Sequence, residues 1–180
     1  YALAILDDNS LPHPHLDVVI TVDEEVGMDG AKALDLSDVK GSRLLNLDSE
    51  EEGYFLAGCA GGASVKHILE TEWENRTGTA YTCKICGLLG GHSGGEIHKE
   101  RGNANSLMGR FLQELSAVTQ IGICWLEGGL ADNAIPREAV LKFVVSEKES
   151  ELEQAVRAFE KVLQAEFSTK DPGVKIEMAT

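Results

Sequence analysis

Residues 79–88, "TAYTCKICGL", alternate apolar and polar side chains in the manner of a β-strand. Tyr81, Cys83 and Ile85 share one face, because successive side chains of a strand point to opposite faces. Beyond this strand the sequence predicts a helix, two strands, a second helix and a last strand, in the ranges 104–118, 121–126, 139–145, 152–167 and 173–178. The order strand, helix, strand, strand, helix, strand over residues 79–178 is typical of a ferredoxin-like α+β domain.

The residues before this domain show a different pattern. Leu16–Val22 is rich in β-branched residues and predicts a strand, Ala31–Leu36 predicts a short helix, and a second apolar run, residues 44–48, ends in acids. Strand, helix and strand in this order predict part of a parallel sheet. Residues 53–73 predict two further strands around a glycine-rich turn. We therefore expect an α/β plus α+β chain, with the boundary between its two parts within residues 53–78.

Carboxylates follow both apolar runs of the predicted parallel sheet. Asp23, Glu24 and Glu25 follow the first run, and Asp48 follows the second. Because parallel strands end on the same edge of a sheet, we expect these acids to converge where open α/β sheets bind ligands. Oxygen ligands suit divalent cations, and an acid left free of metal can act as a general base. The alternative is a solvated acidic edge.

The composition restricts the class of partner. The 180 residues carry a formal net charge of −14 without any Lys/Arg-rich stretch, which disfavours nucleic acid and anionic membranes. No segment approaches the ~20 apolar residues of a membrane span, and no signal peptide is recognisable, so we expect a cytoplasmic protein. The chain lacks an initiator Met and stops directly after a predicted strand, so we expect it to be part of a longer protein.

Three features of the second part have both a functional and a structural interpretation. Cys83 and Cys86 form a Cys-x-x-Cys pair, but the strand pattern around them favours reduced, partly buried thiols over metal or redox use. His92, within "GGHSGG", suits presentation of an imidazole to a ligand or a neighbouring subunit, or is simply exposed. Asn133 either caps a turn or binds a substrate carbonyl or carboxylate, with the Arg137 guanidinium nearby.

Four motifs together resemble a known enzyme family. They are, in chain order, "TVDEEVGMDGA" (21–31), "LLNLDSEE" (44–51), "GLLGGHSGGEIHKERGNAN" (87–105) and "GGLADNAIPREA" (128–139). In this combination the sequence resembles the aminoacyl-histidine dipeptidases, a branch of the co-catalytic dizinc metallopeptidases. The first motif and the Gly-His-Ser-Gly core of the third recur across the wider family, whereas the full third motif is specific to the dipeptidase branch.

The resemblance implies roles for individual residues. It makes Glu24 the general base, Glu25 a ligand to one metal ion and Asp48 a ligand to the other, with zinc as the expected metal. It makes His92 and Asn133 substrate-binding residues of a lid. It also implies that residues 1–55 are a partial catalytic α/β domain and that residues 56–180 form a lid that dimerises, giving a homodimer acting on Xaa-His dipeptides.

The departures from the family pattern limit what this chain can do alone. The His-x-Asp motif, the bridging Asp, the final His ligand and the arginine that binds the substrate carboxylate have no counterpart here. Two acids alone do not hold a dizinc pair, so we predict that the 180-residue chain is inactive by itself and does not bind the two metal ions stably. The competing hypothesis is a non-enzymatic dimerisation module with solvated acids. A magnesium-dependent phosphatase is a third, weaker hypothesis, because it leaves "GGHSGG" without a role.

Overall fold

The computed structural model describes residues 1–48, 51–59, 61, 63, 65–146 and 149–180. The chain divides into two compact units, residues 1–66 and residues 67–180. No helix in the described part of the chain combines the length and the apolar character needed to cross a membrane.

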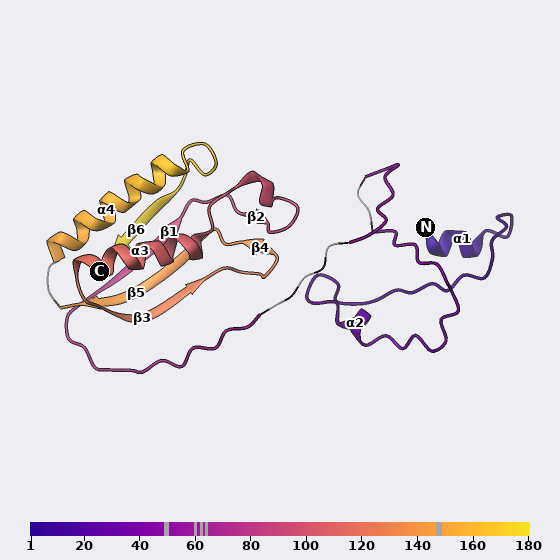
Figure 1. Ribbon diagram of the computed structural model, residues 1–180, viewed down its shortest axis with the longest axis horizontal. Helices are drawn as coiled ribbons and strands as arrows, with labels where there is room; N and C mark the ends of the chain where they lie inside the picture. The colour runs from indigo at the N-terminus through magenta and orange to yellow at the C-terminus, as the bar shows by residue number, and fades with distance from the viewer. Residues whose placement is uncertain (49–50, 60, 62, 64, 147–148) are drawn as a thin grey trace. The chain divides into compact units, whose positions relative to one another are not determined.

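The second unit contains a four-stranded antiparallel sheet in the order β3-β5-β1-β6 (Figure 1). Its strands are β1 (Thr79–Cys86), β3 (Ile121–Gly128), β5 (Ala139–Val145) and β6 (Lys175–Ala179). Helix α3 (Ala104–Val118) follows β1, and helix α4 (Glu149–Glu166) connects β5 to β6. The predicted succession of strands and helices is present, and the prediction of a mixed α/β chain with an antiparallel sheet is confirmed.

Three short elements lie between the main ones. Strand β2 (Gly91–His92) pairs antiparallel with β4 (Ala134–Ile135) in a separate two-stranded sheet. A 3-10 helix, η1 (Ile97–Lys99), follows β2. None of these three was expected from the sequence, because two- and three-residue elements are too short to show a hydrophobic period.

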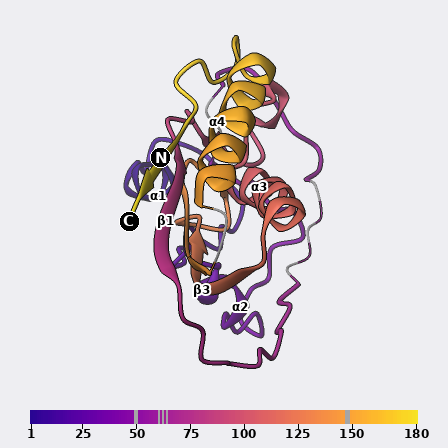
Figure 2. The same cartoon turned by 90° about the vertical axis from the view of Figure 1, so that its left-hand side faces the viewer.

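The core lies between the sheet and its two helices, which lie side by side on the same face of the sheet (Figure 2). Strand β1 buries the predicted face, with Tyr81 opposite Phe143 of β5 and their rings 5.8 Å apart between centroids. Ridges of both helices complete the core with Leu107, Met108, Phe111, Leu115, Leu152, Val156, Phe159 and Leu163. Alternation in the strands and helical spacing in α3 and α4 therefore select one shared apolar layer.

The first unit differs from its prediction. It contains two short helices, α1 (Ala2–Asp7) and α2 (Asp29–Lys32), and no strand is present in residues 1–48. The expected partial parallel sheet is therefore wrong for the described residues. A strand exists only by pairing, and the 16–22 segment pairs with no other strand: the Val22 carbonyl instead accepts from the Gly30 amide at 3.2 Å, and Ile20 remains largely exposed.

The two strands expected within residues 53–73 are likewise absent from the described residues of that stretch, of which positions 60, 62 and 64 are not part. The second unit therefore carries all the strands that the structure describes.

The end of β1 supplies a test of the packing. Gly87 has φ +81°, and a Cβ atom there would collide with the carbonyl oxygen of Gly173. We expect Gly87→Ala to lower the free energy of unfolding by at least about 2 kcal/mol, because it combines a left-handed backbone with a backbone clash. The matched variant is Gly109→Ala, at an exposed position of α3 where no atom lies near the added methyl group. It should raise the free energy of unfolding by up to about 1 kcal/mol, because alanine favours a helix more than glycine does. Urea titration measures both, and equal effects of the two variants would contradict the packing of Gly87 against Gly173.

Candidate functional site

His92 and Asn133, the two substrate-binding candidates of the second unit, lie next to each other. His92 is in β2 opposite Ala134 of β4, and the Ser93 amide donates to the Asn133 carbonyl at 2.8 Å. The His92 side chain is exposed, and Asn133 is half-buried. The short ribbon β2–β4 thus brings together two residues that the sequence placed in separate motifs.

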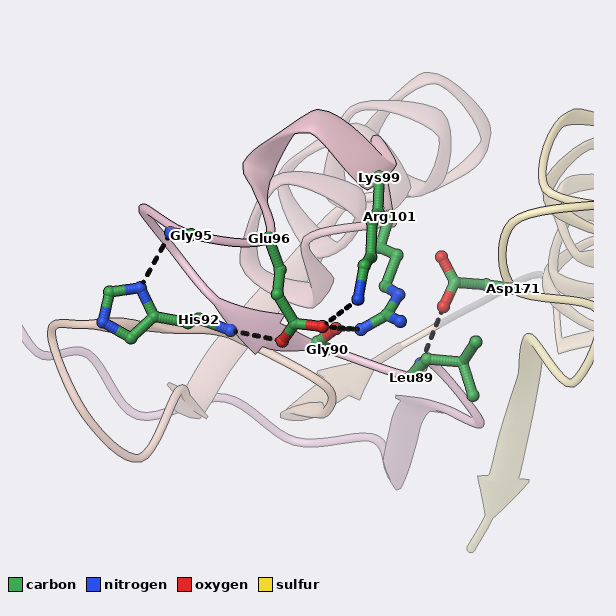
Figure 3. A network of polar contacts seen from close by, with 8 residues as sticks. All are labelled: Leu89, Gly90, His92, Gly95, Glu96, Lys99, Arg101 and Asp171. Atoms are coloured by element: carbon green, nitrogen blue, oxygen red, sulfur yellow. Dashed lines mark hydrogen bonds and ion pairs between the residues drawn. The ribbon is translucent and has the colours of Figure 1, made fainter. Parts of the chain in front are cut away.

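The ring of His92 is held by the backbone of its own loop. Its Nδ1 atom accepts hydrogen bonds from the amides of Gly94 and Gly95, each at 3.0 Å. A neutral imidazole has one acceptor nitrogen and one N–H, so these bonds place the ring proton on Nε2. Figure 3 shows the ring at the outer end of the loop, on the side away from Glu96. His92 therefore offers a hydrogen-bond donor.

Glu96 organises the inside of this loop, residues 89–102, which we call the His92 loop. Its Oε2 accepts the His92 amide at 3.0 Å, and its Oε1 pairs with the Lys99 ammonium and lies 3.5 Å from Arg101 Nη1. Arg101 Nη1 also donates to the carbonyl of Gly90, so it bridges the two sides of the loop (Figure 3). The hydrogen bond from Lys99 and that from the His92 amide lower the pKa of Glu96 to about 2.

A buried carboxylate lies at the base of the His92 loop. Asp171 is fully buried and accepts the Leu89 amide at 2.7 Å and the Gly102 amide at 2.6 Å. These two hydrogen bonds hold the two ends of the His92 loop, because Leu89 is its first residue and Gly102 is its last.

The acids proposed as base and metal ligands lie in the first unit. Glu24, Glu25 and Asp48 are all exposed. The loop that carries the first two closes on itself, since the Met28 amide donates to the Asp23 carbonyl at 2.7 Å. Among the described residues, no group of three His, Cys, Asp or Glu side chains is arranged to hold a metal ion. The described residues by themselves do not fit a divalent metal site.

The Cys-x-x-Cys pair lies in the core rather than at a site. Cys83 and Cys86 are free thiols, both buried on β1. Burial raises the pKa of Cys83 to about 12, so its thiolate is disfavoured. Cys83 therefore packs as a small apolar side chain.

Comparisons with known proteins first define a class. Residues 84–171 match the family model described as the peptidase dimerisation domain. The match covers most of the sheet, both helices and the His92 loop.

Two individual proteins resemble the chain along nearly its whole length. The cytosol non-specific dipeptidase of Escherichia coli strain K12 is 39% identical over 178 residues, which is 97% of this chain and 37% of that protein. The crystal structure of aminoacylhistidine dipeptidase from Vibrio alginolyticus matches with a TM-score of 0.61 and 30% identity, over 99% of this chain and 37% of that one. The resemblance indicated by the sequence motifs is confirmed, and the chain spans about a third of the length of these relatives.

Sequence reasoning missed three residues of the site: Glu96, Arg101 and Asp171. Glu96 and Arg101 follow the recognised "GGHSGG" motif, and their charges of opposite sign were the available signal. Asp171 stands in "KDPG", which reads as an ordinary turn. Its two hydrogen-bond partners, Leu89 and Gly102, lie 82 and 69 positions earlier in the sequence, and no local pattern predicts such contacts.

The depressed pKa of Glu96 predicts how the His92 loop responds to acid. Because the pKa in the folded state, about 2, lies below the ordinary value of 4.5, the stabilisation from this carboxylate is complete above pH 4.5 and is lost as the pH falls toward 2. We expect the side-chain carboxyl carbon of Glu96 to titrate in NMR with a midpoint near pH 2, and the His92 amide signal to move with it. In Glu96→Gln the His92 amide should lose this transition. A Glu96 midpoint near 4.5 would contradict the contacts described.

Proposed function

We propose that this chain is part of a metallodipeptidase that hydrolyses Xaa-His dipeptides. The observation that carries the proposal is the 30% identity, over 99% of the chain, with a protein named aminoacylhistidine dipeptidase. The Escherichia coli relative is named a non-specific dipeptidase, so the two names share dipeptide hydrolysis and differ in specificity. The narrower specificity is proposed because the motif "GGHSGGEIH" around His92 is part of what makes the sequence resemble the aminoacyl-histidine dipeptidases.

The second unit would contact the substrate. We assign His92 as a donor of a hydrogen bond from Nε2 to a carbonyl or carboxylate oxygen, which its two bonds at Nδ1 support. Asn133, beside it across the β2–β4 ribbon, would contribute a side-chain amide that both donates and accepts. Two such groups can orient a peptide without acting as acid or base.

The first unit would supply the proton acceptor and part of a metal site. We assign Glu24 as the general base and Glu25 and Asp48 as ligands of two divalent ions, with zinc expected. The metal, when bound, would polarise the scissile carbonyl. Two exposed carboxylates are too few for such a site, so the remaining ligands would come from outside this chain. For this reason we propose that the 180-residue chain does not hydrolyse dipeptides and does not bind the metal pair stably.

The second part of the chain would serve as a lid. We propose a ferredoxin-like lid in residues 56–180, with its core over 79–178, after a partial catalytic domain in residues 1–55. The sheet order β3-β5-β1-β6, with both helices on one face, supports this arrangement. The description of residues 84–171 as a dimerisation domain also supports an alternative, in which the chain is a dimerisation module without activity.

Two copies of this chain would form the dimer by contacting each other through the surface at β3. β3 is an edge strand, and it leaves Ile123, Trp125 and Leu126 between 44% and 49% exposed. An unpaired edge with large apolar side chains is open to a partner strand or helix. Leu126 also lines a groove with Met108, Gly109 and Leu112 of α3. The family description and this apolar edge together support a homodimer through the lid.

Substitution of Glu24 tests the proposed activity. In the whole protein, Glu24→Gln should lower the turnover of an Xaa-His dipeptide by about 10²–10⁴-fold while bound metal stays unchanged, because the amide cannot accept the proton. Asp38→Asn, another exposed acid of the first unit, is the matched control and should keep full turnover. Unchanged turnover in Glu24→Gln would favour the module without activity. Turnover by the 180-residue chain with added zinc would contradict the argument that its ligand set is incomplete.

A charge on the β3 edge tests the dimer. We expect Leu126→Glu to weaken self-association about a hundredfold, because an unpaired carboxylate would be buried in the contact. Val162→Glu is the matched control: Val162 is 50% exposed on α4, whereas Leu126 is 48% exposed. Light scattering on the purified chain measures the mass of both variants. A dimer that survives Leu126→Glu, or one that dissociates with Val162→Glu, would place the contact elsewhere.

A further inference from the structure

Asp171 combines complete burial with a charged side chain. It follows α4, in the connection to β6, and it is fully buried. A buried carboxylate is costly unless hydrogen bonds compensate for the lost water. Here each oxygen accepts a backbone amide, Oδ1 from Leu89 at 2.7 Å and Oδ2 from Gly102 at 2.6 Å. One side chain therefore joins two points of the chain that bracket the His92 loop.

The surroundings of Asp171 bring both ends of the loop to the α4–β6 connection. Gly87, just before the loop, passes so close to Gly173 that a Cβ atom on Gly87 would collide with the Gly173 carbonyl oxygen. At the other end, a Cβ atom on Gly102 would lie 2.8 Å from the Leu88 side chain and 3.3 Å from that of Phe167, so Gly102 packs closely against both. A third contact joins Lys170 Nζ to Glu100 Oε2 at 2.8 Å.

From the anchored ends, polar contacts continue to His92. Arg101, next to the anchored Gly102, donates to the carbonyl of Gly90, next to the anchored Leu89. The same guanidinium lies beside Glu96, which accepts the His92 amide. Figure 3 shows this succession, from Asp171 and Leu89 through Arg101 and Glu96 to His92.

The composition of the loop explains why such an anchor is needed. Four glycines, Gly90, Gly91, Gly94 and Gly95, flank His92 and Ser93. Glycine loses more backbone freedom on ordering than any other residue, so a loop of this kind does not fix an imidazole by itself. Closing its two ends on one rigid carboxylate removes a large part of that freedom.

We propose that Asp171 is a positioning residue for His92, acting through the Leu89 and Gly102 amides without touching the substrate. The value of this position for catalysis rests on the proposed function, whereas the ordering of the His92 loop does not. An Asp171 that only stabilised the fold would act on all of the second unit alike. A positioning Asp171 acts first on the ring of His92 and on the amides that bind it.

The experiment uses NMR and amide hydrogen exchange on the 180-residue chain. In Asp171→Asn, one of the two amides loses its acceptor, because the Nδ2 group of asparagine is itself a donor. We expect the amides of Gly94 and Gly95 to exchange about tenfold faster, and the ¹⁵N signals of the His92 ring to move toward those of a mixture of tautomers. The outcome that overturns the proposal is an unchanged His92 ring signal and unchanged exchange at Gly94 and Gly95.

Two control variants separate positioning from stability. Val156→Ala removes core volume from α4, so it lowers the unfolding midpoint, yet it should leave the His92 ring signals unchanged. Glu100→Gln removes only the exposed contact with Lys170 and should also leave them unchanged. If Val156→Ala moves the His92 signals as much as Asp171→Asn does, Asp171 has no specific role.

The unmodified chain gives an independent test that holds even if Asp171→Asn does not fold. If the anchor orders the loop, the amides of Leu89, Gly102, Gly94 and Gly95 open together, with one opening free energy and one urea dependence. Opening of Gly94 and Gly95 while Leu89 and Gly102 stay protected would overturn the proposal.

The whole protein distinguishes this inference from the proposed function. There we expect Asp171→Asn to lower kcat/KM for an Xaa-His dipeptide about tenfold, with Val156→Ala unchanged. If the whole protein hydrolyses no dipeptide, the proposed function fails while the NMR result still decides the role of Asp171.

Discussion

The position of β1 between β5 and β6 is the constraint on which the second unit depends. This strand pairs with β5 over residues 79–85 and with β6 over residues 82–86, and it directs Tyr81, Cys83 and Ile85 into the core. Because β1 and β6 are neighbours, the chain leaving β1 starts beside the turn that enters β6. The close approach of Gly87 and Gly173 follows from this pairing, because Gly87 comes directly after β1 and Gly173 lies just before β6. The site is therefore built where two strands far apart in sequence meet.

The same physical chemistry explains what the sequence predicted and what it did not. The main helices and strands of residues 79–178 were predictable because most of them contribute apolar side chains to one core, so their hydrophobic period indicates the fold directly. Leu16–Val22 carries the same kind of signal, yet it forms no strand, because a strand also needs a partner that local pattern does not reveal. The sequence motifs single out His92 and Asn133 as individual candidates. Their closeness at the β2–β4 ribbon, and the hydrogen bonds of Asp171 to residues distant in sequence, depend on tertiary contacts that leave no period in the sequence.

The carboxylates of this acidic chain fall into two groups that differ in what compensates their charge. Glu96 and Asp171 accept backbone amides, and Glu96 also faces two cationic side chains, so both are held in fixed places. Glu24, Glu25 and Asp48 are exposed, and solvent compensates them. The first group shapes the loop around His92, whereas the second remains accessible to a ligand. Identical chemical groups thus differ in fixation and accessibility according to their surroundings.

The state of His92 defines what its loop can contribute to chemistry. The two glycine amides at Nδ1 favour the tautomer with a proton on Nε2, and that proton is directed away from the loop. A ring in this state stabilises negative charge on an oxygen by donating to it, and it does not take a proton from water. Under the proposed function, proton transfer would then be left to a carboxylate such as Glu24. Under the proposed function, the order of the His92 loop would therefore matter for orientation of the substrate rather than for proton transfer.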